Sequence, residues 1–170
     1  QRSLVGSEMC IRDSVCYMTK KKLCFRWILF GGYLLLLSYF LFFAEIMGRT
    51  NLTRTYHYNL VPFLEIKRFI IYRKKLGMTA VVVNLLGNVA AFLPFGFFLP
   101  FLSQKNRSFA YVTLISFEFS LLIECIQLVS KVGSFDVDDM ILNTLGGSLG
   151  YLCFWVARKW KKRRNEKKEE

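Results

Sequence analysis

The sequence predicts an all-α integral membrane protein: a four-transmembrane-helix bundle with an interfacial amphipathic helix in the first external loop. Three observations lead to this class. The chain of 170 residues is 54% hydrophobic, whereas a soluble domain is roughly 45–50% apolar. Its apolar residues gather into long blocks, and short basic stretches separate these blocks. The formal net charge of the chain is +12, and its basic residues flank the apolar segments. This pattern excludes a soluble enzyme and a nucleic-acid partner.

Four apolar blocks are long enough to cross a bilayer, which takes ~20 residues. They cover residues 25–44, 78–102, 109–129 and 140–157. Residues 1–14 resemble translated vector sequence, and Met18 is a more natural start. We therefore expect residues 1–17 to be a non-native leader. Residues 18–157 are then the expected transmembrane domain, and residues 158–170 an expected basic cytoplasmic tail.

The loop of residues 47–77 is long for a helix connection. Within it Phe63, Ile66 and Ile70 are spaced three and four apart, while Lys67 lies elsewhere on the helical wheel. This spacing predicts an amphipathic helix in the membrane interface. A re-entrant segment is the alternative, but the charges in the loop disfavour a full span.

The distribution of Lys and Arg predicts the orientation. Four spans place both ends of the chain on one side, where fourteen Lys and Arg residues gather against eight on the other. The excess predicts that both termini are cytoplasmic and that the protein is a multi-pass protein of the cell membrane. The basic run Arg73-Lys74-Lys75 beside the second span acts against this assignment.

Polar residues in separate segments fall at one membrane depth, because they lie near the same ends of their spans. An intramembrane carboxylate is costly, by ~2.5 kcal/mol or more, and needs partners. We therefore expect Asn88, Glu124 and Asn143 to lie within side-chain reach of one another. Interhelical adhesion is the alternative, which we favour for Asn84 and Gln127 taken singly. The full candidate binding cluster is Asn84, Asn88, Glu124, Gln127, Asp136, Asp139 and Asn143.

The acidic run before the fourth span admits two interpretations. Asp136, Asp138 and Asp139 are weak candidates for holding Mg²⁺, with Glu124 as a ligand or base. Asp136 or Asp138 could instead serve as the N-cap of the fourth span. We expect no cofactor, with Mg²⁺ as the one alternative, and no catalytic residue is assigned.

Three segments taken together resemble the VanZ-like family. They are Asn59-Leu60-Val61-Pro62-Phe63, the stretch 84–96 (NLLGNVAAFLPFG), and Glu124 and Gln127 leading into 134–147 (SFDVDDMILNTLGG). The likeness covers roughly residues 34–151. The resemblance implies a cell-envelope protein of Gram-positive bacteria, where most relatives occur. It also suggests a link to antibiotic resistance, because the founding member is associated with reduced susceptibility to teicoplanin.

Two functions follow as hypotheses. The first is a non-enzymatic membrane protein that contacts membrane lipids. It would bind a lipid-linked cell-wall intermediate, a lipoglycopeptide or a partner protein at the outer leaflet. Cations of the interfacial helix would receive phosphate or anionic headgroups. The second is a metal-dependent intramembrane enzyme that acts on a lipid phosphate. We favour the first, since no nucleophile is evident and the lone histidine, His57, lies in a loop.

Overall fold

The structure is a computed structural model that describes residues 21, 23–42, 58–102, 108–131 and 133–169. Contacts divide the chain into two units, residues 1–37 and 38–170. In the first unit an apolar helix begins at Leu23, and the ring of Phe30 contacts those of Trp27 and Tyr33 at 6.4 and 6.0 Å between centroids. The predicted leader at 1–17 lies outside the described residues.

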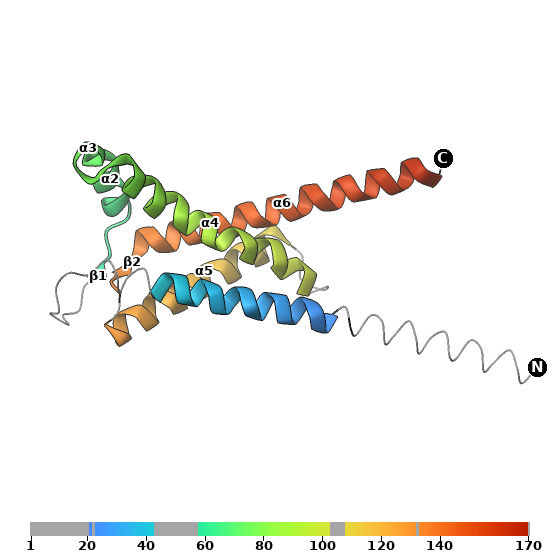
Figure 1. Ribbon diagram of the computed structural model, residues 1–170, viewed down its shortest axis with the longest axis horizontal. Helices are drawn as coiled ribbons and strands as arrows, with labels where there is room; N and C mark the ends of the chain where they lie inside the picture. Colours follow the sequence, from blue (N-terminus) through green and yellow to red (C-terminus); the bar gives the residue numbers. More distant parts are fainter. Residues whose placement is uncertain (1–20, 22, 43–57, 103–107, 132, 170) are drawn as a thin grey trace, which may run out of the picture. The chain divides into compact units, whose positions relative to one another are not determined.

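The second unit is built mainly from three long helices (Figure 1). A short strand β1 is followed by helices α2 and α3, which lead directly into the first long helix, α4. The other two long helices, α5 and α6, are connected by strand β2. The bounds are β1 Tyr58–Asn59, α2 Leu64–Ile71, α3 Arg73–Leu76, α4 Met78–Leu102, α5 Phe109–Ser130, β2 Phe135–Asp136 and α6 Val137–Glu169.

Four helices in the described residues are long and apolar enough to cross a membrane, which confirms the predicted class. They are Leu23–Phe42, Val81–Leu102, Phe109–Ser130 and Val137–Lys167. The expected helix in the first loop is present as α2, and Ile70 on its apolar face is exposed.

Helices α4 and α6 cross at glycines (Figure 1). A methyl group added at Gly96 would overlap the carbonyl oxygen of Gly147, so the two backbones are in direct contact there. Gly146 and Gly150 lie equally close to the backbone of α4. Close approach through small residues is typical of membrane helices. In lipid the hydrophobic effect does not drive helices together, so they associate through close van der Waals packing.

Aromatic rings fill the space between α4 and α5. Phe92 is fully buried, and the rings of Phe95 and Phe119 stack with centroids 4.9 Å apart. Helices α4 and α5 therefore pack against each other through aromatic rings.

Two features were not predicted. Residues expected to be loop form the parallel pair β1–β2, in which Tyr58 faces Phe135 and Asn59 faces Asp136. The basic tail is also not separate from the fourth span, because α6 continues as one helix to Glu169. Lys and Arg are good helix formers, so nothing in the tail sequence ends the helix.

Candidate functional site

The site is built where the loop of β1 meets the start of α6. Asp136 precedes α6, and its Oδ1 accepts the N–H of Asp138 at 2.9 Å. This bond is that of an N-cap, as predicted for Asp136. The same oxygen accepts Nδ2 of Asn59 at 3.2 Å, and Asn59 Oδ1 accepts the N–H of Val61 at 3.1 Å. Asp136 thus ties the first loop to the fourth span.

Asp138 accepts three backbone hydrogen bonds. Its Oδ2 accepts the N–H groups of Glu65 and Ile66 at 2.8 and 3.1 Å, and its Oδ1 accepts the N–H of Phe63. These donors lie at the start of α2, which has no cap from its own flanking residue. Asp138 is 1% exposed. A buried carboxylate from a distant helix therefore supplies both the cap and the charge that a helix N-terminus favours.

Glu124 supports this arrangement from α5. Its Oε2 accepts the N–H of Asp136 at 2.9 Å, and its side chain is 2% exposed. Gln127, one turn later, is buried, and Gly133 lies against its side chain. Glu124 therefore satisfies a buried backbone donor of β2 and fixes the position of the acidic run.

Asp139 points toward the second predicted span, where its Oδ1 accepts Nδ2 of Asn88 on α4. Asn84, one turn earlier on α4, is exposed. The structure thus links Asn88 to the acidic run.

Asn143 lies deeper between α5 and α6. Its Nδ2 donates to Ser120 Oγ at 2.9 Å, while its Oδ1 has no hydrogen-bond partner among the described residues. The hydrogen bonds of Asn88, Glu124 and Asn143 given above all reach residues outside that trio. They form three pairs: Asn88 with Asp139, Glu124 with the backbone of Asp136, and Asn143 with Ser120.

Burial raises the pKa of Asp136 above its usual value of 3.8, and the nearby charges of Asp138 and Glu65 act in the same direction. The hydrogen bonds from the Asp138 N–H and from Asn59 oppose this rise. Burial is the largest cause, so the carboxyl group of Asp136 takes up a proton more readily than a free aspartate.

Asp136, Asp138 and Asp139 are the candidate Mg²⁺ ligands of the sequence. Within the described part of the chain, no group of three or more His, Cys, Asp or Glu side chains could hold a metal ion. The oxygens of Asp136, Asp138 and Asp139 accept hydrogen bonds from amide groups of the protein.

Sequence reasoning missed Asn59 and Ser120 as members of the cluster and the role of Asp138 as the cap of α2. Asn59 lies in a segment that carries the family resemblance, which was the available signal. Asp138 falls off the helical stripe of Asp136, Asp139 and Asn143, so helical spacing pointed away from it.

Fold and site together define a multi-pass α-helical membrane protein whose first loop is fastened to its last helix by buried carboxylates. The VanZ/LLP1 family model matches residues 30–158, and the chain belongs to this family. It is 33% identical over 79 residues to Protein VanZ of Enterococcus faecium, an alignment of 45% of this chain and 47% of that protein. The chain thus spans about half the length of this relative. No solved structure matches significantly.

Proposed function

We propose that the protein is a non-enzymatic component of the cell membrane that binds an amphiphilic anionic ligand at the outer leaflet. The ligand class is a lipid-linked cell-wall intermediate or a lipoglycopeptide, and its capture would lower susceptibility to teicoplanin. The binding surface is that of α2 and α3, which we call the loop platform, residues 64–76. Both termini of the chain are then cytoplasmic.

One observation carries this proposal: the Asp138 carboxylate caps α2 through three backbone N–H groups. A short helix of eight residues is not stable alone. Tying its first turn to α6 holds the platform in a fixed position beside the membrane-spanning helices. The acidic residues therefore contribute by positioning a surface, which is a binding role and needs no chemical step.

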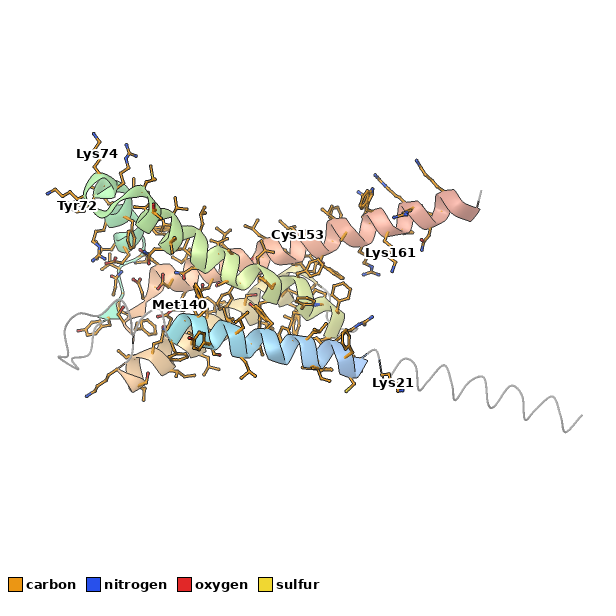
Figure 2. All side chains as sticks on the ribbon, in the orientation of Figure 1. Lys21, Tyr72, Lys74, Met140, Cys153 and Lys161 are labelled. Carbon is orange, nitrogen blue, oxygen red and sulfur yellow. The ribbon has the colours of Figure 1, made fainter. Side chains whose placement is uncertain are left out.

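The platform combines cations with exposed apolar side chains. Apart from Arg68, which pairs with Glu65 at 2.7 Å, its cations have no ion pair among the described residues. Lys74 projects from the end of the platform together with the Tyr72 ring (Figure 2). The exposed cations are Lys67, Arg68, Arg73, Lys74 and Lys75, and the exposed apolar side chains include Leu64, Ile70, Ile71 and Tyr72.

This combination suits a ligand with a phosphate group and a lipid tail. Lys and Arg bind phosphate by charge-assisted hydrogen bonds, and apolar side chains at the interface bury acyl chains.

The test is binding by the full chain in nanodiscs of neutral lipid. The probes are teicoplanin and a polyprenyl pyrophosphate that carries the cell-wall disaccharide. We expect the double variant Lys74→Gln/Lys75→Gln to bind either probe at least about tenfold more weakly, since each charge-assisted bond contributes roughly 1.5–3 kcal/mol. The matched control is Lys161→Gln/Lys162→Gln, which removes the same charge at the far end of α6 and should bind normally (Figure 2).

Equal binding by both double variants would overturn the platform as the binding surface. Release of phosphate from the lipid probe that requires Mg²⁺ and is lost in Asp136→Ala would instead establish the enzymatic alternative. Teicoplanin susceptibility of cells at matched membrane levels then reports whether the binding affects resistance.

A further inference from the structure

Helix α6 is longer than a membrane is thick, so its C-terminal third extends beyond the hydrocarbon. The helix has 33 residues, which is about 50 Å at 1.5 Å per residue. The hydrocarbon core is ~30 Å thick and takes ~20 residues. The first charge after the apolar part of α6 is Arg158, so residues 158–169 continue as a helix outside the hydrocarbon. We call these residues the basic extension.

The basic extension carries a dense and almost unpaired positive charge. Residues 158–169 contain eight Lys and Arg residues and two acidic residues, Glu166 and Glu169. The one ion pair found there among the described side chains joins Lys162 and Glu166 at 3.8 Å, and both side chains are exposed. Such a pair stabilises a helix weakly. The charge of this segment is therefore available to a partner.

The arrangement of the charges decides how the extension meets the membrane. At 100° per residue, the cations from Arg158 to Lys167 cover the whole circumference of the helix. A helix that lies flat on a bilayer needs one apolar face, and this segment has none. The extension therefore projects from the bilayer as a continuation of the span.

Aromatic side chains mark the level of the headgroups. Trp155 and Trp160 are exposed, and Lys159 lies over the Trp155 ring with its Nζ 4.9 Å from the centroid. Tryptophan is enriched where a span leaves the hydrocarbon. An open groove on the same helix is lined by Trp160, Arg163, Arg164 and Lys167. Cations and an indole ring thus lie together where phosphate groups of lipids would be.

We infer that the basic extension is a binding site for anionic phospholipid headgroups, which it collects around the end of α6. Charge complementarity favours this partner, because an anionic leaflet attracts juxtamembrane Lys and Arg within a Debye length of its surface. The inference does not depend on the ligand of the loop platform, which lies at the other end of the second unit (Figure 2).

The experiment uses quenching of Trp160 by brominated lipid in the full chain with Trp27→Phe and Trp155→Phe. Vesicles of phosphatidylcholine contain the same small fraction of either brominated phosphatidylglycerol or brominated phosphatidylcholine. We expect stronger quenching by the anionic lipid. The excess should fall roughly fivefold for each cation removed in Lys161→Gln and Lys162→Gln, and molar salt should abolish it because screening is then complete.

The control Lys74→Gln/Lys75→Gln removes the same charge from the loop platform and should leave Trp160 quenching unchanged. Equal quenching by the two brominated lipids in the parent protein would overturn the inference. An excess that persists in Lys161→Gln/Lys162→Gln would overturn it as well. If Lys161→Gln/Lys162→Gln loses the excess quenching by anionic lipid but still binds the platform probes, the lipid site is distinct from the binding surface of the proposed function.

Discussion

At the scale of single residues, the Asp138 carboxylate joins two segments more than seventy positions apart. Its oxygens accept backbone donors that water would otherwise solvate, and a buried N–H left without an acceptor costs about 1–3 kcal/mol. Asp136 and Glu124 act in the same way on neighbouring amides. Hydrogen bonds to the backbone therefore account for Asp136 and Asp138, whereas Asp139 accepts from the side chain of Asn88.

The raised pKa of Asp136 predicts a pH effect on stability. The fold disfavours the charged form of Asp136. Below a pH equal to the ordinary pKa of 3.8 the residue is protonated in both states, so it does not lower the free energy of unfolding. Its cost appears as the pH rises through the raised pKa and is complete above it. Asp136→Asn keeps the capping oxygen without the charge, so its stability relative to the parent protein should increase with pH.

Unfolding free energies of both proteins in detergent, measured at several pH values from about pH 4 to about pH 8, test this sign. A variant that loses stability relative to the parent as the pH rises would show that burial does not dominate at Asp136.

Part of the site follows from the sequence at this scale. Asp136 lies immediately before a strongly apolar helix, so its role as an N-cap was predictable from local rules. The partners of Asp138 were not, because they are backbone groups of a distant loop and carry no sequence signal. Likewise Asn143 pairs with Ser120, a residue type common in membrane helices for many reasons.

At the scale of elements, the crossing of α4 and α6 depends on glycine. We expect Gly96→Ala to destabilise the protein by about 1–3 kcal/mol, since its methyl group would overlap the carbonyl oxygen of Gly147. The control is Gly87→Ala on the same helix, where no atom lies within 4 Å of the added methyl group. That change should be neutral or slightly stabilising, because Ala favours helix.

Denaturant titrations followed by circular dichroism in micelles give both values. If the two alanine variants were equally stable, α4 and α6 would not be in backbone contact at Gly96.

Hydropathy located the elements well, because a span is a local property of ~20 residues. It did not reveal the strands β1 and β2, which have two residues each and depend on pairing between distant segments. Hydropathy also did not show the length of α6. A change from apolar to basic composition marks where a helix leaves the membrane, but it does not mark where the helix ends.

At the scale of the whole molecule, the distribution of charge predicts which side of the membrane the loop platform and the basic extension face. In a protein without other cysteines, Lys74→Cys should react with an impermeant maleimide in intact cells, whereas Arg164→Cys should react only after permeabilisation. The physical reason is the excess of Lys and Arg on the side of the termini. The reverse pattern of labelling would place the loop platform in the cytoplasm.

The central claim is that a buried carboxylate holds the loop platform on the membrane-spanning helices. Hydrogen exchange at the amides of Phe63, Glu65 and Ile66 tests it most directly. These N–H groups start a short helix and would exchange rapidly without an acceptor. We predict slow exchange in the parent protein and exchange roughly 10–100-fold faster in Asp138→Ala. Asp138→Asn, which keeps one acceptor, should be intermediate, and the Ile123 amide of α5 should be unaffected. Equal exchange at the three amides in all three proteins would contradict the account.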